Sequence, residues 1–473
     1  MFKPLITAAL AIGLIAASAS AQDAAELDAE IEAITKSLID QALVDEVGLA
    51  FVEDMTTEVG QRLAGSPAEK RARAWAVTEL SELGFDNVRI EAFEIPFWSR
   101  VSESVSVLSP SPQPFVATAL GGSAATPNGG VSGTVVRFEN LAELQNAPIS
   151  AIDGKIVFID ETMIKSMDGS GYGMAVRKRS GCAQAASDKG ALACLIRSVG
   201  TQPHRMPHTG IMMRDGAEGA GPVAAISGPD ADQLARLLKR GPVNVAVNIQ
   251  TETKTNVPSG NVIAELTGTD LKDEIVLIGC HLDSWDLGTG ALDDGAGCGI
   301  VVGAAKLIAG LPKRPRRTIR VVLYGAEEVG LFGATAYARA HGDDLDKHVL
   351  AAESDFGAAP VWRFQTRFGE AALPYARTLQ NVLMPLGVTP GDNRASGGPD
   401  VGILARSGVP VVSPGQNGID YFDYHHTPDD TFDKIKPDEF RQNVAVYAAF
   451  AFIAAETGWD FRAQPEPESA GTE

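Results

Sequence analysis

Cysteine and basic residues are scarce in this sequence of 473 residues. Four cysteines (Cys182, Cys194, Cys280 and Cys298) are too few for a disulfide-built scaffold, and the sequence does not choose among their three full pairings. A Cys182–Cys194 bridge is one option, and buried free thiols are the alternative. Lysine and arginine total 40 against 60 aspartates and glutamates, which gives a net charge of -20. Without a basic face, the protein lacks what nucleic acid binding requires.

Long apolar runs are also missing after the first 21 residues, so we expect no membrane span in the mature protein. Lys3 precedes an apolar stretch at 5–17, and Ala19-Ser20-Ala21 has the small side chains of a cleavage site. This pattern predicts a secretory signal peptide at 1–21 and export to the periplasm or the extracellular space. An uncleaved anchor is the alternative, but the stretch is shorter than the roughly 20 residues of a spanning helix.

The composition itself, 45% hydrophobic and 21% charged, is that of a globular protein with a sizeable core, and the length suggests two or three domains. The first part has helical patterns at 26–43, 47–59 and 67–83 and a short strand near 88–93. Ser66-Pro67-Ala68-Glu69 has the spacing of a capping box, with proline at the first helical position.

Residues 102–254 differ in composition, with short strand-like runs separated by glycine, proline and serine. The runs are 131–138, 155–159 and 191–197, and a helical stretch at 177–189 precedes the last of them. The pattern predicts a separate, inserted α/β domain.

After residue 261, strand-like and helical segments alternate, and several strands are continuously apolar. Continuous apolar runs suit strands covered on both faces, so we expect an α/β fold with a mostly parallel or mixed sheet between helix layers. The main domain would combine 22–101 and 255–461, followed by a disordered tail at 462–473. The strands are 261–266, 274–280, 318–324, 349–353 and 409–413, and the helices are 293–310, 331–341, 370–385 and 436–456.

Acidic residues and histidines follow the ends of successive predicted strands in this last part. The carboxyl ends of neighbouring strands meet at one edge of such a sheet, where ligands bind. Each residue alone has an ordinary explanation, such as a helix N-cap or a packing histidine, but together they indicate one site. They are His281 and Asp283, Asp293, Glu327 and Glu328, Asp355, and His426.

Mixed imidazole and carboxylate ligands favour zinc, and the set suits two ions per chain. Three carboxylates and one bridging hydroxide balance the charge of two Zn²⁺ ions. We expect one ion on His281, Asp293 and Asp355, and the other on Asp293, Glu328 and His426, with Asp293 as the bridge.

Two more acids have expected roles beside these ligands. Glu327 is next to a ligand without being one, which suits the general base for the attacking water. Asp283 lies two residues past His281, on the same face of an extended segment, and is expected to accept the other ring N–H. Cys280 faces the opposite side from His281 and is not expected to bind metal.

The ordered motifs are His281-x-Asp283, Asp293-Asp294-Gly295-Ala296-Gly297, Glu327-Glu328-x-Gly330-Leu331, Ser354-Asp355 and His426-Thr427-Pro428-x-Asp430-Thr431. This set resembles the co-catalytic zinc exopeptidases, which include secreted bacterial aminopeptidases and glutamate carboxypeptidases. Within that family it is most similar to the carboxypeptidase Q, or plasma glutamate carboxypeptidase, branch, as are the segments 62–66 and 207–210. The resemblance covers most of the mature chain. It implies the same metal, base and fold, an insert that caps the catalytic face, and a cis peptide bond between Asp293 and Asp294.

Substrate-side residues are less defined by the sequence. The family often has tyrosine directly before the last histidine ligand, as a donor to the developing oxyanion; here His425 holds that place and Tyr424 is displaced by one. His208 in the insert could reach the substrate or stabilise a turn. The segment Ser396-Gly397-Gly398 could line the pocket or form an ordinary turn.

The sequence thus predicts an exported di-zinc metallo-exopeptidase that hydrolyses dipeptides or short peptides. A metal-bridging hydroxide would attack, and Glu327 would pass the water's proton to the leaving amine. Two alternatives remain: an acyl transferase with one zinc, similar to glutaminyl cyclase, and a receptor-like module with an inactive site. The preferred side chains, the choice between aminopeptidase and dipeptidase, and a homodimeric state stay open.

Overall fold

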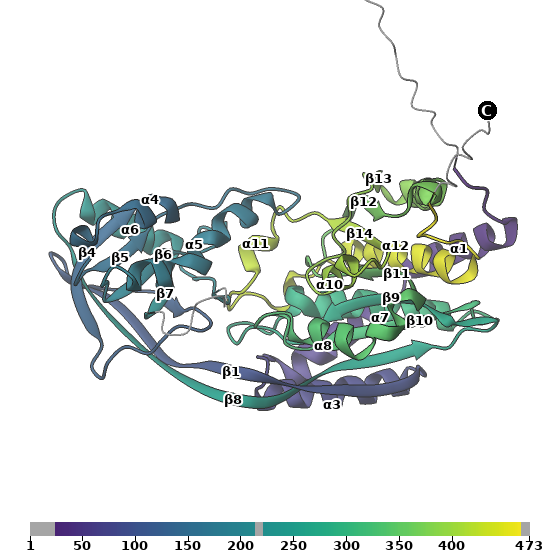
Figure 1. Ribbon diagram of the computed structural model, residues 1–473, viewed down its shortest axis with the longest axis horizontal. Coiled ribbons are helices and arrows are strands. Elements are labelled where there is room, and N and C mark those ends of the chain that lie inside the picture. The colour runs from purple at the N-terminus through teal and green to yellow at the C-terminus, as the bar shows by residue number, and fades with distance from the viewer. Residues whose placement is uncertain (1–23, 213–220, 465–473) are drawn as a thin grey trace, which may run out of the picture.

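The computed structural model describes residues 24–212 and 221–464 of the chain (Figure 1). The predicted signal peptide at 1–21 lies outside the described residues. In the described ranges, every helix is too short or too polar to cross a bilayer.

Two α/β parts lie side by side, joined by a long antiparallel ribbon of two strands (Figure 1). The ribbon consists of β1 (Asp86–Ser109) and β8 (Asn244–Leu266), so the strand expected near 88–93 is only the beginning of β1. The predicted boundaries after residues 101 and 254 fall inside these two strands. The chain therefore enters and leaves the insert along continuous strands rather than through loops.

The sheet of the main part is mixed, with a parallel centre, as predicted. Its order is β13-β12-β14-β11-β9-β10-β8. The strands β14, β11, β9 and β10 are parallel neighbours, β8 pairs antiparallel with β10, and β12 pairs antiparallel with β14 but parallel with β13. The strands are β9 (Leu271–His281), β10 (Arg317–Tyr324), β11 (His348–Glu353), β12 (Val361–Arg367), β13 (Thr389–Pro390) and β14 (Val411–Gln416).

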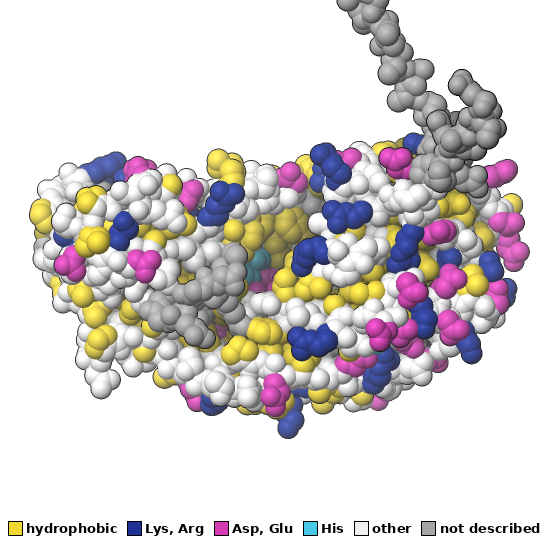
Figure 2. Space-filling model, in the orientation of Figure 1, with side chains coloured by type: hydrophobic (Ala, Val, Ile, Leu, Met, Phe, Trp, Pro, Cys, Tyr) yellow, Lys and Arg dark blue, Asp and Glu magenta, His cyan; other side chains and the backbone are white. Residues whose placement is uncertain are grey.

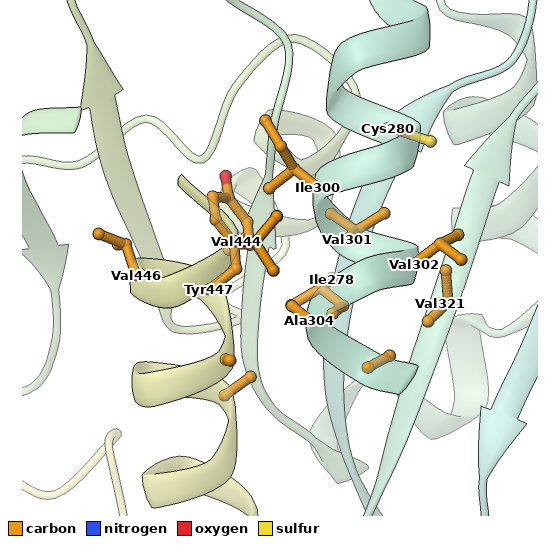
Figure 3. Close-up of a cluster of buried hydrophobic side chains, with 14 of the residues drawn as sticks. Ile278, Cys280, Ile300, Val301, Val302, Ala304, Val321, Val444, Val446 and Tyr447 are labelled. Atoms are coloured by element: carbon orange, nitrogen blue, oxygen red, sulfur yellow. The ribbon is translucent and has the colours of Figure 1, made fainter. Parts of the chain in front are cut away.

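Helices cover both faces of this sheet, which explains the continuous apolar runs. In β9, Val276 and Ile278 belong to one buried cluster, and Ile275 and Leu277 belong to another on the opposite face. Figure 3 shows the first cluster, where α7 and α12 pack against the strands. The helices are α1 (Ala29–Ala42), α2 (Val47–Asp54), α3 (Pro67–Glu82), α7 (Ala296–Ala309), α8 (Phe332–Ala340), α9 (Leu373–Leu383), α10 (Val401–Arg406), α11 (Tyr421–Tyr424) and α12 (Pro437–Glu456).

The insert continues the same sheet, because β8 also pairs with β4 of the insert. The order runs on as β8-β4-β5-β6-β7-β3, with β4 to β7 parallel to one another and β3 antiparallel at the edge. Buried clusters lie on both faces here too. The elements are β2 (Gln113–Phe115), which pairs with β1, β3 (Ala117–Ala119), β4 (Val131–Phe138), α4 (Leu141–Asn146), β5 (Ile156–Ile159), α5 (Ser170–Ser187), β6 (Ala193–Arg197), β7 (Val223–Ile226) and α6 (Gly228–Leu238).

All four cysteines are paired, one disulfide in each part. Cys182–Cys194 joins α5 to β6 in the insert, which is the bridge considered above. Cys280–Cys298 joins the end of β9 to α7 in the main part. The expectation of free buried thiols is therefore wrong.

Two local predictions need correction. Ser66 caps α3 by accepting the N–H of Glu69, but Glu69 does not reach back to Ser66; its carboxylate pairs with Arg73 at 2.7 Å instead. The C-terminal tail begins later than residue 462, since the side chain of Arg462 donates to two backbone carbonyls and Ala463 accepts an N–H from Ala371. Residues 465–473 lie outside the described ranges.

Candidate metal centre and substrate cavity

Five predicted ligands meet at one edge of the main sheet. His281 is the last residue of β9, Glu328 lies in the turn after β10, and Asp355 follows β11. Asp293 lies in the turn that leads into α7, and His426 follows α11. Parallel strands place their carboxyl ends together, so residues far apart in the sequence converge here.

Asp293 lies between the two histidines, with one carboxylate oxygen directed at each. Its Oδ1 is 3.2 Å from Nε2 of His281, and its Oδ2 is 3.1 Å from Nε2 of His426. Nε2 of His281 is also 3.5 Å from Oδ1 of Asp355, and Nε2 of His426 is 2.9 Å from Oε2 of Glu328. The structure thus brings the five residues together in the two groups of three that the sequence predicted, with Asp293 common to both.

The charges of this cluster favour bound cations. Burial alone would raise the pKa of Asp293, but the imidazoles of His425, His281 and His426 around it hold that pKa well below its usual range. Oδ2 of Asp293 and Oε1 of Glu328 are nevertheless buried without a hydrogen-bond partner. Buried carboxylate oxygens are stable only when they are paired, hydrogen-bonded or coordinated to metal. Carboxylates and imidazoles at this spacing fit zinc ions.

The turn that presents Asp293 is held by two other carboxylates. The peptide bond between Asp293 and Asp294 is cis, which confirms the prediction from the family resemblance. Asp294 accepts the backbone N–H groups of His281, at 3.0 Å, and of Gly297, at 3.1 Å. Asp430 accepts those of Leu292 and Asp293, at 2.6 and 3.2 Å. Asp294 and Asp430 therefore position the bridging residue without touching the metal site themselves.

Arg62 holds the backbone of the same loop through hydrogen bonds. Its side chain is fully buried and donates to the carbonyl oxygens of Leu282 at 2.7 Å, Thr289 at 2.6 Å and Gly290 at 3.0 Å. These carbonyls belong to the segment that connects His281 to Asp293. The sequence signal was present in the segment 62–66, but nothing in it indicated which side chain acts or on what.

The two histidine ligands are oriented through their second ring nitrogens, both by backbone oxygens. Nδ1 of His281 lies 2.9 Å from the carbonyl oxygen of Asp283 and 3.8 Å from its carboxylate. The expected bond to the Asp283 carboxylate is therefore wrong; that carboxylate accepts the N–H of Glu327 at 3.0 Å. Nδ1 of His426 lies 3.2 Å from the carbonyl oxygen of Thr209, which belongs to the insert. The insert thus helps to fix a ligand of the main part.

Glu327 is beside this cluster and faces the adjoining cavity. Burial raises the pKa of its carboxyl group well above the usual range, and the nearby Asp355, Glu328 and Asp283 raise it further. Its backbone is held by Asp283, while its side chain is left to the cavity. The position suits a base that acts on a water molecule or substrate at the ligand cluster.

A cavity of about 540 Å³ lies over the cluster, between the main part and the insert. Figure 2 shows the hollow, with a histidine and acidic side chains at its floor and hydrophobic side chains on its walls. Ser396, Gly397, Gly398 and His425 line it, as expected for substrate-side residues. The insert contributes a wall that the sequence did not indicate, formed by Asp168, Tyr172, Arg179 and Ile211.

Two expected substrate-side residues do not line this cavity. The ring of Tyr424 packs under the ammonium group of Lys434, 5.9 Å away, on the outer side of α11. His208 is fully buried, and its Nδ1 contacts the carbonyl oxygen of His425, so it holds the backbone of this loop rather than substrate. The structure therefore does not place Tyr424 at the cavity, and for His208 it agrees with the alternative in which this residue stabilises a turn.

His425 is a second imidazole close to the bridging acid. Its Nε2 lies 3.5 Å from Oδ2 of Asp293, and its ring stacks on that of His426. In the described ranges, a further trio of potential ligands is Cys280, Asp294 and Cys298, but its two sulfur atoms form a disulfide. Asp293, His425 and His426 also lie close enough together to share an ion, so His425 is a further candidate ligand beside the five predicted residues.

Comparison with known proteins agrees with this geometry. Residues 261–451, which carry every predicted ligand, match the profile described as Peptidase family M28. Carboxypeptidase Q of Mus musculus is 34% identical over 400 residues, which are 84% of this chain and 83% of that protein.

Solved structures extend the likeness to the insert. A peptidase M28 precursor from Shewanella amazonensis SB2B is 50% identical, with a TM-score of 0.90 over 93% of this chain and 99% of that one. A zinc aminopeptidase from Bacillus subtilis is 19% identical, with a TM-score of 0.63 over 88% of this chain and 98% of that one. This last likeness shows a shared fold.

Proposed function

The chain belongs to peptidase family M28 and is a metallopeptidase, and we propose that it is an exported exopeptidase with two zinc ions that hydrolyses dipeptides or short peptides. The observation that carries the proposal is the place of Asp293 between two sets of ligands, with one oxygen toward each histidine. The relatives named above include a carboxypeptidase and a zinc aminopeptidase. Export is proposed from the signal-peptide pattern at 1–21.

His281, Asp293 and Asp355 would hold one ion, and Asp293, Glu328 and His426 the other. Zinc ions bound there would act as Lewis acids toward the scissile carbonyl and the attacking water. Glu327 takes the proton of that water and delivers it to the nitrogen of the leaving amine. Tyr172, Arg179 and Ile211 of the insert line the cavity together with Glu327, which reduces the exposure of the site to bulk water.

The two alternatives predict different metal contents or activities. An acyl transferase with one zinc would need only one of the two ligand groups, whereas both groups are assembled here around Asp293. An inactive receptor-like module would have no use for a carboxylate such as Glu327, which faces the cavity beside the ligands. A metal-to-protein ratio of one would support the first alternative.

Replacing the proposed base tests the function directly. Glu327→Gln should retain two zinc ions per chain but lose about 10²–10⁴-fold in turnover, the usual cost of removing a general base. Metal content and hydrolysis of a dipeptide panel would be measured on the same preparation, with the exposed Glu82→Gln as the control variant. Near-full activity in Glu327→Gln would rule out the assigned base. No hydrolysis by the zinc-loaded wild-type chain would rule out the function.

A further inference from the structure

A second, much smaller cavity adjoins one of the two ligand groups. Its volume is about 10 Å³, which is close to the smallest space that holds one water molecule. Asp293, Glu328 and His426 are the residues that it shares with the large cavity, so the ligand group of one proposed zinc ion separates the two spaces. Trp285 also lines the small cavity and has no part in the proposed mechanism.

Three buried polar atoms on the residues of this small cavity have no hydrogen-bond partner within residues 24–212 and 221–464. They are Nε1 of Trp285, Oε1 of Glu328 and Oδ2 of Asp293. The indole N–H can only donate, and the oxygens of an ionised carboxylate can only accept. A water molecule satisfies one donor and two acceptors, because its oxygen accepts and both its hydrogens are donated. Buried polar groups that lie too far apart for a direct bond are commonly joined in this way.

The two carboxylate oxygens of Glu328 differ in their surroundings. Oε2 lies 2.9 Å from Nε2 of His426 and is the oxygen placed to bind zinc. Oε1 makes no hydrogen bond to the described part of the chain, so these residues leave the rotation of the carboxylate without a polar restraint. A hydrogen bond to Oε1 would supply that restraint, as the partners behind metal ligands generally do.

The indole ring of Trp285 is fixed beside this cavity. It is 3% exposed and belongs to a small apolar cluster with Leu63 and Phe97. Its six-membered ring faces Gly121 of the insert so closely that a Cβ atom there would lie 2.2 Å from the nearest ring carbon. The ring centre is 5.9 Å from that of His426. Because the ring is held away from bulk water, the acceptor of its N–H is expected in the buried space that the ring lines.

We propose that the small cavity binds one water molecule, through which the indole N–H of Trp285 fixes the carboxylate of Glu328. Trp285 is then a positioning residue for the ion held by Asp293, Glu328 and His426, and not for the other ion. The inference rests on the proposed two-zinc function and adds to it a residue that holds one ligand group in place. This water is not the one consumed in hydrolysis, because the ligand group separates it from the large cavity.

The zinc affinity of matched variants tests this role. Trp285→Phe removes the N–H and keeps an aromatic ring in the apolar cluster. It should weaken the binding of one zinc ion about 10- to 100-fold, the usual cost of losing a partner behind a metal ligand. The loss should appear when Trp285→Phe is added to Asp355→Asn, in which the Glu328 group is intact. It should be absent when it is added to Glu328→Gln, and competition with a chelator on the full chain measures both.

The indole N–H signals give a readout that does not depend on activity. In NMR spectra of isotope-labelled protein, the signal that Trp285→Phe removes should shift when zinc is added and should receive magnetisation from a long-lived water. Trp98 packs against the same cluster, but its N–H donates to the carbonyl oxygen of Ser123 at 2.9 Å, so its signal should stay in place. Trp98→Phe is therefore the matched control and should bind both zinc ions as the wild type does.

A tryptophan analogue with sulfur in place of the N–H, incorporated at position 285, replaces Trp285→Phe if that variant does not fold, because it keeps the shape of the ring. Unchanged zinc affinity, an equal loss of both ions, or a Trp285 signal that ignores zinc or receives nothing from water would overturn the inference. Each of these results leaves the two-zinc peptidase standing. A wild-type chain that binds fewer than two zinc ions, or hydrolyses no peptide, would overturn the proposed function and this inference with it.

Discussion

The main part and the insert contribute walls of opposite character to one cavity. The main part supplies carboxylates and imidazoles clustered at strand ends, and two of the carboxylate oxygens are buried without a hydrogen-bond partner. The insert supplies a guanidinium, a phenol and backbone carbonyls from the side of α5 and the loop before residue 212. The difference places the proposed ligands and the proposed base entirely in the main part, whereas the insert forms part of the wall around them.

The two parts are nevertheless coupled at the loop that carries His425 and His426. Thr209 of the insert accepts from His426, and His208 contacts the backbone of His425. A shift of the insert relative to the main part would therefore move a metal ligand as well as the substrate wall. The continuous strands β1 and β8 restrain such a shift, because they pair along almost their entire length.

The largest effect should come from the bridging acid of the main part. Asp293→Asn weakens the only ligand shared by both ions, so zinc content should fall below two per chain. Activity should fall by at least the roughly 10²–10⁴-fold lost with a general base. Metal content by mass spectrometry and dipeptide turnover would measure both.

Single-site ligand variants give the matched control for Asp293. Asp355→Asn and Glu328→Gln should each weaken the binding of one zinc ion and leave the binding of the other unchanged. Each of these residues belongs to one ligand group only. Two tightly held zinc ions in Asp293→Asn would refute the bridging role. Identical metal loss in all three variants would mean that the ions are not held independently.

The two disulfides allow the same comparison at the level of stability. They close loops of similar size, with sequence separations of 12 in the insert and 18 in the main part. Removing either pair with alanines should cost about 3 kcal/mol in the free energy of unfolding. Only the Cys280–Cys298 pair joins the strand that ends at His281 to the helix after Asp293, so only its loss should also weaken zinc binding. Denaturant unfolding and zinc titration of the two double variants test this, and zinc loss in the insert variant would contradict it.

The main sheet was predictable because its strands are buried on both faces and therefore continuously apolar. Runs such as Ile275–Ile278 leave no other interpretation, and the strands found start or end within a few residues of the predicted ones. The long ribbon was not predictable, since β8 between Thr251 and Asn256 is polar and exposed. Its stability comes from backbone pairing with β1, which leaves no hydrophobic pattern to detect.

The site also contains residues that the sequence predicted and residues that it missed. The metal ligands and Glu327 were found because they follow strand ends in recognisable motifs. The hydrogen bond that orients His281 was predicted to the carboxylate of Asp283, whereas the structure has it on the backbone carbonyl of the same residue. Sequence identifies the residue but not which of its oxygen atoms is in reach. Arg179 gave no signal at all. It follows two other basic residues, Arg177 and Lys178, in the same helix, and sequence does not say which of the three faces a cavity.

A buried lysine gives the insert its own pH dependence. Lys178 on α5 donates only to the carbonyl of Glu161, and burial lowers its pKa to about 8, despite Glu161 and Asp160 nearby. The unfolded chain, with an ordinary lysine pKa, binds more protons above pH 8, so stability should rise with pH there. Between pH 7.5 and 9.5 the gain should be about 2 kcal/mol, and Lys178→Met should abolish it. Denaturant unfolding at both pH values measures the difference, and an equal rise in the variant would contradict it.

The smallest effect should come from a buried histidine of the main part, at the end of β11 opposite to the one that Asp355 follows. His348, at the start of β11, is fully enclosed, and burial lowers its pKa to about 4, with Arg320, His341 and Arg462 lowering it further. Its ring accepts or donates only to the hydroxyl of Tyr337 and the carbonyl of Asp344. The folded pKa lies below that of the unfolded chain, so the stabilisation is present above pH 6.5 and is lost as the pH falls toward 4. Between pH 7 and 5.5 the free energy of unfolding should fall by about 1 kcal/mol more in the wild type than in His348→Gln. Taking this difference removes the contribution of the carboxylates that both proteins share.

His341→Gln is the matched control, because that ring pairs with Glu91 and packs near His348. This variant should lose as much stability as the wild type over the same pH range. A wild-type chain whose stability did not fall more than that of His348→Gln over this range would show that His348 is protonated in the folded state.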